Sequence, residues 1–503
     1  MQITNPILPG FHPDPSVICV DKDYYLVTSS FEFFPGVPIF HSRDLVHWRQ
    51  LGHVLTRKSQ LNLDKCGYSQ GVWAPTIRYH QGTFYLITTN MGRGGNFYVT
   101  AKDPAGSWSD PIWVDKHGFD PSLFFDDDGT VYYSRRNGGE IVQAEIDITT
   151  GKFKSDLKSI CKGMCSPDIE GPHLYKINRW YYLMCAEGGT RFGHSETMAR
   201  SKSPWGPWEK CPHNPIVTHR HLSGHEIRDT GHGELLQAHD GSWWFFCLGT
   251  RHREYDSASI LGRETFMAPV SWTEDGWPII GDKGKIPSQF EGPSLPPHPW
   301  PAESPRDDFD KTELSPCWNF LRNPHDADWS LTERPGYLRL KGSAVSLNDQ
   351  DSSAFVGRRQ DQFEIIAQAL LEFEPQHENE EAGLTVYLTN NYHYELAITM
   401  RNGKKVAVTK KRVGDISIES ECVSIASGPA IVCIQSTHKE YSFLVGSNEI
   451  DLKTVSSGIG KFLSPELAGF CWTGVYFGMY SSGNGKKCSF PADFNWFYYK
   501  ANQ

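Results

Sequence analysis

The chain has 503 residues, of which 49 are basic and 59 acidic, and its formal net charge is −10. Its length exceeds one ordinary domain, and 39% hydrophobic and 13% aromatic residues are enough to build large cores. Neither charge sign forms a long run, which excludes the basic surface of a nucleic-acid binder. No stretch has the roughly 18 uncharged apolar residues of a membrane span, and no secretion signal opens the chain. We therefore expect a protein that binds neither nucleic acid nor membrane and is cytoplasmic, or secreted if a signal was removed from the chain.

A repeated phrase organises the first half of the chain: a short apolar strand, a turn, and a strand dense in aromatic residues. Its apolar anchors lie 60, 46, 51 and 61 residues apart, at Val17, Ile77, Leu123, Leu174 and Leu235. This period is typical of β-propeller blades, each of about four strands. Turn signals such as Asp127-Asp128-Gly129 separate the strands. We therefore predict five blades.

The repeat ends before a segment with six prolines between Pro293 and Pro305, which lacks the backbone donors of a sheet and reads as a linker. We predict a propeller domain over residues 1–305 and a second domain over residues 306–503. In the second domain longer strands alternate in polarity, so that Tyr394, Leu396 and Ile398 share one face. No useful helical periodicity appears. The expected fold is all-β, a five-bladed propeller followed by a two-sheet sandwich.

Three copies of the repeat carry a carboxylate near the start of the inner strand. Asp14 and Asp120 stand directly before Pro-Ser and the apolar anchor, and Glu170 stands one residue earlier, before Gly-Pro. Because the first strand of each blade lines the central channel, equal positions reach the same mouth of it. A turn or capping role explains a single Asp-Pro well. Three acids in register are harder to explain in that way, because buried like charges destabilise a fold.

The chemistry of converging carboxylates is narrowed by the motifs that the sequence lacks. It contains no HExxH, no serine-centred elbow and no phosphate-cradling loop, and His219, His221 and His225 match no zinc spacing. We therefore predict no catalytic metal. Paired acids with aromatic walls are typical of glycoside hydrolysis, in which one carboxyl protonates the leaving oxygen and another activates water or attacks the sugar. A third acid can orient the donor and keep it protonated.

The segments NPILPGFHPDPS, GVWAPTIRY, GFDPSLFFDDDG, EGPHLY and LGRET closely resemble glycoside hydrolase family 43, in its branch of β-xylosidases and α-L-arabinofuranosidases. The region from DDFD to DFNWFYY resembles the concanavalin-like β-sandwich that accompanies this branch. The resemblance implies an exo-acting enzyme that inverts the anomeric centre. It also implies that Asp14 is the general base, that Asp120 orients the donor and tunes its pKa, and that Glu170 is the general acid.

The resemblance further implies a small pocket for one pentose. Phe31 and Trp73 match its apolar walls, Arg263 matches a hydroxyl-binding cation, and His232 matches a histidine that contacts the sugar-binding centre, sometimes through water or a calcium ion. The residues by themselves leave other roles open. Phe31 and Trp73 read equally as core residues, Arg263 as an ion-pair partner of Glu264, and His232 as a histidine bonded to a nearby carbonyl.

In this branch the sandwich sends an aromatic residue toward the active-site mouth, and the segment CWTGVYFGMY makes Trp472 or Tyr476 the candidate. No cofactor is required, and a structural calcium ion is left open. The expected substrate is a xylo- or arabinoxylo-oligosaccharide. Short rim loops leave the choice between xylosyl and arabinofuranosyl groups open, and both activities are compatible with the sequence.

Three other functions fit the same architecture. They are an arabinofuranosidase that mainly debranches arabinoxylan, a carbohydrate-binding propeller without turnover, and a scaffold for protein interactions. Sugar affinity that survives loss of the acids would favour the binding function, and exposed apolar patches without sugar affinity would favour the scaffold. The three acids argue against both non-catalytic functions. The sequence does not indicate the oligomeric state.

Overall fold

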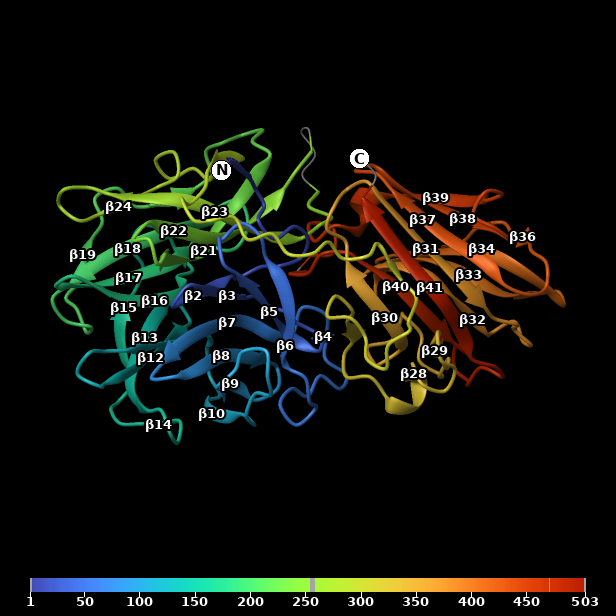
Figure 1. Cartoon of the computed structure of the whole chain (residues 1–503), viewed down its shortest axis with the longest axis horizontal. Coiled ribbons are helices and arrows are strands. Elements are labelled where there is room, and N and C mark those ends of the chain that lie inside the picture. The colour runs from blue at the N-terminus through green and yellow to red at the C-terminus, as the bar shows by residue number, and fades with distance from the viewer. Residues whose placement is uncertain (1, 254–257, 470, 502–503) are drawn as a thin grey trace.

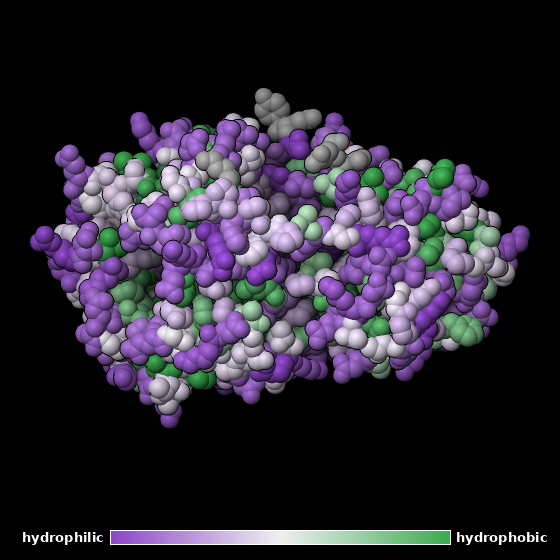
Figure 2. All heavy atoms as spheres, viewed as in Figure 1, coloured by the Kyte–Doolittle hydropathy of each residue, from purple (hydrophilic) through white to green (hydrophobic). Residues whose placement is uncertain are grey.

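The computed structural model describes residues 2–253, 258–469 and 471–501. Figure 1 shows two β-rich halves, with the N-terminal half in blue to green and the C-terminal half in orange to red. The only helices within the described ranges are two 3-10 turns, η1 (Asp326–Asp328) and η2 (Gly460–Leu463), which confirms the predicted all-β fold. None of the helices there has the length and apolarity of a membrane span. On the face drawn in Figure 2, hydrophobic residues are scattered among hydrophilic ones.

The N-terminal half is the predicted five-bladed propeller. The first blade contains β2 (Ser16–Val20), β3 (Asp23–Val27), β5 (Gly36–Ser42) and β6 (Arg49–Leu55). The second contains β7 (Gly71–His80), β8 (Thr83–Met91), β9 (Gly95–Ala101) and β10 (Ile112–Asp115). The third contains β11 (Phe119–Phe125), β12 (Val131–Asn137), β13 (Glu140–Asp147), β14 (Lys152–Phe153) and β15 (Lys158–Cys161).

The remaining two blades complete the ring. The fourth contains β16 (Glu170–Ile177), β17 (Trp180–Glu187), β18 (Ser195–Ser201), β19 (Glu209–Lys210) and β20 (Val217–Thr218). The fifth contains β21 (Ile227–Gln237), β22 (Trp243–Arg251), β23 (Arg263–Trp272) and β24 (Pro278–Ile280). The inner strand β2 contacts both β7 and β21, so the ring is closed. At its periphery β1 (Gln2–Thr4) pairs with β25 (Gln289–Glu291).

Each inner strand carries the same local distortion three residues before its apolar anchor. The residues at this position have φ angles of 54°, 38°, 54°, 56° and 47°, and are Asp14, Ala74, Asp120, Gly171 and His232. This left-handed conformation is unfavourable for residues with a Cβ atom, and in β7, β11, β16 and β21 the pairing register shifts at the same place. Such bulges re-aim side chains. All five residues line one small cavity of about 10 Å³ where the inner strands meet.

The C-terminal half is a sandwich of two antiparallel sheets. One sheet contains β28 (Trp329–Ser330), β29 (Leu338–Leu340), β41 (Ala492–Ala501), β31 (Ile365–Glu372), β37 (Ala430–Ser436), β38 (Glu440–Gly446) and β39 (Lys453–Ile459), with β26 (Arg306–Asp307) paired to β41. The other contains β30 (Ala354–Arg359), β40 (Tyr476–Ser482), β32 (Glu381–Thr389), β33 (Tyr392–Arg401), β34 (Lys404–Val413) and β35 (Ile416–Glu419), with β36 (Val423–Ser424) paired to β34. Tyr394, Leu396 and Ile398 lie together in the hydrophobic core, as their alternation predicts.

The two halves share an aromatic core. The propeller strand β4 (Phe33–Phe34) pairs with β27 (Phe320–Leu321) of the C-terminal half. Beside this pairing, the ring of Phe33 stacks on that of Tyr476, with 3.9 Å between centroids and 9° between planes. Aromatic residues bury large apolar areas and pack in restricted geometries, so this shared core fixes the position of the sandwich against the propeller.

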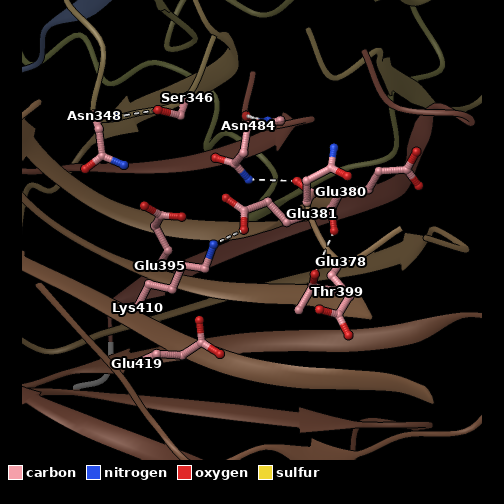
Figure 3. A network of polar contacts seen from close by, with 12 residues as sticks. Ser346, Asn348, Glu378, Glu380, Glu381, Glu395, Thr399, Lys410, Glu419 and Asn484 are labelled. Atoms are coloured by element: carbon pink, nitrogen blue, oxygen red, sulfur yellow. Dashed lines mark hydrogen bonds and ion pairs between the residues drawn. The ribbon is translucent and has the colours of Figure 1, made fainter. Parts of the chain in front are cut away.

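A buried charged cluster lies on the sheet of β32, β33 and β34 (Figure 3). The ammonium of Lys410 binds the carboxylate of Glu381, and the hydroxyl of Tyr480 donates to Glu395 over 2.8 Å. Burial and the nearby charge of Glu395 raise the pKa of Glu381 to about 7. Buried charges are costly without a partner. Lys410 therefore compensates for Glu381 on the face of this sheet that points away from the core between the two sheets. Glu395 has its own partner in His393, with 3.0 Å between Nε2 and Oε1.

Candidate active site

A cavity of about 760 Å³ opens above the distorted ends of the inner strands. Eight of the nine side chains singled out from the sequence line it, namely Asp14, Phe31, Trp73, Asp120, Glu170, His232, Arg263 and Trp472. Seven belong to the propeller, and Trp472 belongs to the sandwich. The cavity volume is in the range of pockets for small organic ligands.

Asp14 is buried among groups that favour its ionised form. The hydroxyl of Ser29 donates to Oδ2 over 2.5 Å, and Nη1 of Arg263 lies 3.3 Å from Oδ1. Burial opposes ionisation, but the Arg263 guanidinium and the His232 ring together hold the pKa of Asp14 below its ordinary value. Asp14 is therefore a carboxylate at neutral pH.

Asp120 and Glu170 form a close pair with the opposite tendency. Their carboxylate oxygens and a ring nitrogen of His232 all lie within 4.8 Å of one another. Burial is the largest effect on Asp120, and with the negative charges of Glu170 and Asp14 it raises the pKa of Asp120 to about 7. Burial likewise raises the pKa of Glu170, against the opposing effects of His232 and Arg136. The pair therefore retains a proton under conditions in which Asp14 has lost its own.

The bulge explains why Glu170 stands one residue earlier in the repeat than the other acids. In its blade the left-handed position is taken by Gly171, whose N–H donates to Oδ2 of Asp120 over 3.1 Å. Glu170 instead occupies the position just before the bulge, as Trp73 and Phe119 do in their own blades. That position also lines the cavity. Glu170 thus reaches the cavity from the residue before the left-handed position, whereas Asp14 and Asp120 occupy that position itself.

Aromatic rings form the apolar walls. Phe31 lies 6.1 Å from Trp73 between ring centroids, and Trp73 packs edge-on against Phe119 at 5.4 Å. The guanidinium carbon of Arg263 lies 5.6 Å from the ring centroid of Phe31 and 5.7 Å from that of Trp472. Phe31 is almost fully buried, so it belongs to the aromatic core and to the cavity wall at once.

Arg263 and His232 lie next to the acids, and Nη2 of Arg263 also donates to the backbone carbonyl of Trp472 over 3.2 Å. The guanidinium of Arg263 pairs with Asp14 and donates to the hydroxyl of Thr190 over 3.1 Å, whereas Glu264 pairs with Arg251 at 2.8 Å. Nδ1 of His232 lies 3.9 Å from Oδ1 of Asp14. The sequence left an Arg263–Glu264 ion pair open, and the structure does not form it.

The structure corrects the expectation for Tyr476. Its ring is fully buried at the start of β40, where it stacks on Phe33, and its hydroxyl lies 3.4 Å from Oδ1 of Asn319. Trp472 stands four residues earlier, in the loop before β40, and reaches the cavity. Of the two candidates from the sandwich, only Trp472 is placed to contact a ligand.

Several cavity residues carry no signal in the repeat. Arg136 forms a 2.8 Å ion pair with Glu170 and a 3.3 Å pair with Asp168, and its guanidinium lies over the ring of Phe119. Tyr68, Gln70, Met91 and Gln350 complete other parts of the lining. Most of these residues come from loops and outer strand ends, where the repeated pattern stops.

Calcium fits the described site poorly. The group of Asp120, Glu170 and His232 offers two carboxylates and one ring nitrogen. Calcium prefers roughly six to eight oxygen ligands. These three side chains therefore do not by themselves make a calcium site.

Two family models match the chain: "Glycosyl hydrolases family 43" over residues 3–278, and "Beta xylosidase C-terminal Concanavalin A-like domain" over residues 306–500. The chain belongs to glycosyl hydrolase family 43. It is therefore a glycoside hydrolase, and the predicted propeller and concanavalin-like sandwich are those of the family.

Relatives within the family match along the whole chain. A non-reducing end alpha-L-arabinofuranosidase of Bacteroides ovatus is 46% identical, over 98% of this chain and 94% of its own length. A xylosidase/arabinosidase of Butyrivibrio fibrisolvens is 38% identical, over 98% of both chains. The solved structure "Bacteroides ovatus Xyloglucan PUL GH43B" superposes with a TM-score of 0.97 at 45% identity and covers both chains completely.

Proposed function

We propose that this member of family 43 removes single terminal pentoses from xylan-derived oligosaccharides, with inversion at the anomeric carbon. The observation that carries the proposal is the opposite shift of two acids in one cavity. The pKa of Asp14 is lowered and that of Glu170 is raised. Titratable groups whose environments push their pKa values apart are the usual basis of acid and base roles.

Asp14 is the general base in this proposal. Its carboxylate takes a proton from a water molecule, and the oxygen of that water attacks the anomeric carbon on the face opposite the leaving group. The bond from the anomeric carbon to the leaving oxygen breaks as the new bond forms. The configuration of the sugar is therefore inverted, and Asp14 is left with the proton.

Glu170 is the general acid. Its carboxyl gives a proton to the leaving oxygen, which departs as a hydroxyl group. Asp120, the second member of the close pair, orients the donor, and because two carboxyls so close together do not readily ionise at once, the pair keeps one proton for Glu170 to give. After release of both sugars, the proton on Asp14 returns to solvent and Glu170 takes up another. No cofactor is needed.

The walls of the cavity support a terminal pentose as the group that is cleaved. Trp472 from the sandwich and Phe31 from the propeller both approach Arg263, so the cavity is walled from both domains. We propose that Arg263 and His232 bind sugar hydroxyls, since both lie beside Asp14. A cavity walled from both domains suits a chain end better than the middle of a polymer.

Both pentoses remain within the proposal. The Butyrivibrio fibrisolvens relative carries xylosidase and arabinosidase in its name. Removal of α-L-arabinofuranosyl groups as the main activity is a second candidate, and it is favoured by the 46% identity to the arabinofuranosidase of Bacteroides ovatus. We propose a β-xylosidase that also acts as an α-L-arabinofuranosidase.

The test compares p-nitrophenyl β-D-xyloside, p-nitrophenyl α-L-arabinofuranoside and xylobiose as substrates of the wild-type protein. We expect turnover of both aryl glycosides and release of xylose from xylobiose. Turnover of the arabinofuranoside alone would favour the second candidate. Binding of these sugars without turnover of any of them would contradict the proposed hydrolysis.

A further inference from the structure

Both tryptophan walls of the cavity are anchored to one buried serine. Ser69 lies in the loop between β6 and β7, and its carbonyl accepts a 2.8 Å hydrogen bond from Nε1 of Trp73. Its hydroxyl accepts a 2.8 Å hydrogen bond from the backbone N–H of Trp472, 403 residues further along the chain. Ser69 therefore connects the propeller wall of the cavity with the sandwich wall.

The third polar group of Ser69 is held by a carboxylate. Its N–H donates to Oε2 of Glu32 over 2.9 Å, so the N–H, the carbonyl and the hydroxyl of Ser69 are all engaged. Ser69 has a φ of 59°, an unfavourable conformation for serine that needs support from its surroundings. Glu32 itself is fully buried between the two domains.

The carboxylate of Glu32 does not gain enough from this contact to explain its burial. Its second oxygen, Oε1, has no hydrogen-bond partner among the described residues, and burial raises the pKa of Glu32 to about 7 against the opposing charge of Arg322. Burying an acid in this way is costly. The carboxylate has two partners, the charge of the buried Arg322 and the N–H of Ser69, and through the second it holds the loop that carries Ser69.

Arg322 of the sandwich holds the same loop from the other side. Its backbone N–H donates to the carbonyl of Glu32 over 2.9 Å, and its Nε donates to the carbonyl of Cys66 over 2.6 Å. Asn323 adds bonds to the backbone of Leu63 and Leu61. The sandwich therefore holds the loop that carries Ser69 by hydrogen bonds that are separate from those of Ser69 to the two tryptophans.

We infer that Glu32 and Ser69 are positioning residues that set the separation of Trp73 and Trp472, and thereby the fit of the terminal sugar. Neither side chain reacts with the substrate. The carboxylate fixes the backbone of Ser69, and Ser69 fixes the two walls. The inference rests on the proposed function, because the walls matter only if a sugar lies between them.

The first test replaces Ser69 with alanine, which removes the hydroxyl that accepts from Trp472 and also contacts the thiol of Cys471, and which leaves the backbone bonds in place. One hydrogen bond of this kind corresponds to an increase in KM of about 3- to 10-fold with little change in kcat. A merely structural defect would instead lower apparent kcat, because fewer molecules would be folded, at unchanged KM. Ser436→Ala is the matched control, since this buried hydroxyl also accepts from a backbone N–H, that of Ile365, inside the sandwich. It should leave KM unchanged.

The second test asks whether Ser69 acts through Trp472. In the Trp472→Ala background, Ser69→Ala should change KM by less than about 1.5-fold, because the ring that it positions is gone. An equal rise in KM with and without the ring would overturn the inference. So would an unchanged KM in Ser69→Ala.

The role of Glu32 is tested with a conservative variant and a disruptive one. Glu32→Gln keeps an oxygen for the N–H of Ser69 and should raise KM less than about 3-fold, whereas Glu32→Leu removes the acceptor and should raise it more than about 10-fold. Equal KM values in the two folded variants would overturn this role. If Glu32→Leu does not fold, the Ser69 series still decides the inference.

A separate readout keeps this inference distinct from the proposed function. If the wild-type protein hydrolyses no pentoside, the proposed function fails, and no KM can be measured for the Ser69 variants. Acrylamide quenching of tryptophan fluorescence then tests the anchoring directly. Ser69→Ala should increase quenching, and the increase should vanish in the Trp472→Phe background. Identical quenching of wild type and Ser69→Ala would overturn the inference.

Discussion

Replacing Glu170 with alanine removes the carboxyl that we assign as the proton donor, and the loss should depend on the leaving group. The leaving group of xylobiose is a sugar hydroxyl, which needs a proton. The kcat/KM of Glu170→Ala for xylobiose should therefore fall by about 100- to 10,000-fold. This corresponds to about 3–5 kcal/mol of transition-state stabilisation. The leaving group of 2,4-dinitrophenyl β-D-xyloside is dinitrophenolate, a stable anion that needs no proton. The kcat/KM for this substrate should therefore fall by less than about 10-fold.

The structure supplies a control for the side effect of this substitution. Glu170→Ala also deprives Arg136 of its 2.8 Å ion pair. Asp168 pairs with the same guanidinium at 3.3 Å, but its side chain is 59% exposed. An exposed pair contributes about 0.2–1 kcal/mol, so Asp168→Ala should lower kcat/KM by at most about 5-fold on either substrate. Losses beyond this size in Glu170→Ala therefore report the missing proton.

The assay measures kcat/KM for both substrates with wild type and both variants, after circular dichroism has shown that each variant is folded. Equal losses on xylobiose and on the dinitrophenyl xyloside in Glu170→Ala would refute the assignment of Glu170 as acid. A loss of the same size in Asp168→Ala would instead assign the effect to Arg136.

Four further predictions rest on the charges of the active site and of the sandwich cluster. Asp14→Ala should lower kcat/KM by about 100- to 10,000-fold on every substrate whatever the leaving group, because each reaction needs an activated water; a loss confined to poor leaving groups would contradict the base role. The pH profile of kcat/KM should be bell-shaped, since the lowered pKa of Asp14 keeps the base active into the acidic range, and activity should fall as the pH rises through about 7, where the pair of Asp120 and Glu170 loses its proton. Asp120→Asn should move that alkaline limb to lower pH, because a negative charge that favours the protonated donor is gone; an unmoved limb would contradict the pairing. Lys410→Met should lower the free energy of unfolding in urea at pH 8 by about 3–5 kcal/mol, because it leaves Glu381 buried without its cation.

The pH dependence of the last variant follows from the raised pKa of Glu381, which is about 7 in the folded protein. A carboxyl with a raised pKa favours the folded state at acidic pH, and this contribution is lost as the pH rises through the folded pKa. The defect of Lys410→Met should therefore be smaller at pH 5 than at pH 8. Lys411→Met, which removes the neighbouring lysine, is the control and should cost less than about 1 kcal/mol. Equal stability of the two variants would contradict the role of the cluster in Figure 3.

The propeller could be predicted because its inner strands obey one local rule. Each anchor from Val17 to Leu235 follows a left-handed residue by three positions, and this repeat is visible in the sequence as Asp-Pro, Ala-Pro, Gly-Pro and His-Gly. The same rule brought Asp14 and Asp120 to one point. It also accounts for Glu170, since Gly171 occupies the left-handed position in that blade.

Arg136 could not be found in the same way. It pairs with Phe119 across the hairpin of β11 and β12, but the bulge at Asp120 shifts the register between them by one residue. Counting outward from the turn at Asp127-Asp128-Gly129 therefore places Arg136 opposite Asp120 rather than Phe119. A bulge changes the pairing without any change in the apolar pattern, and the sequence pattern alone does not reveal it.

The sequence pattern does not decide whether Trp472 or Tyr476 reaches the cavity, for a related reason. Both lie in one aromatic segment, but Tyr476 begins β40 and faces the shared aromatic core, whereas Trp472 lies in the preceding loop. Which residue enters the cavity depends on the docking of two domains, and the bond from the Trp472 N–H to Ser69 joins positions 403 residues apart. The cytoplasmic location stays a prediction, and the oligomeric state and the sugar preference, which the sequence left open, likewise depend on more than the pattern of one strand.

The stereochemistry of hydrolysis tests the central assignment most directly, because a base that activates water gives the opposite anomer to a carboxylate that attacks the sugar. Proton NMR during the first turnovers of a β-D-xyloside would record which anomer of xylose appears before mutarotation. If Asp14 is the base, α-xylose appears first. The appearance of β-xylose first would contradict this assignment, since Asp14 would then act as a nucleophile rather than a base.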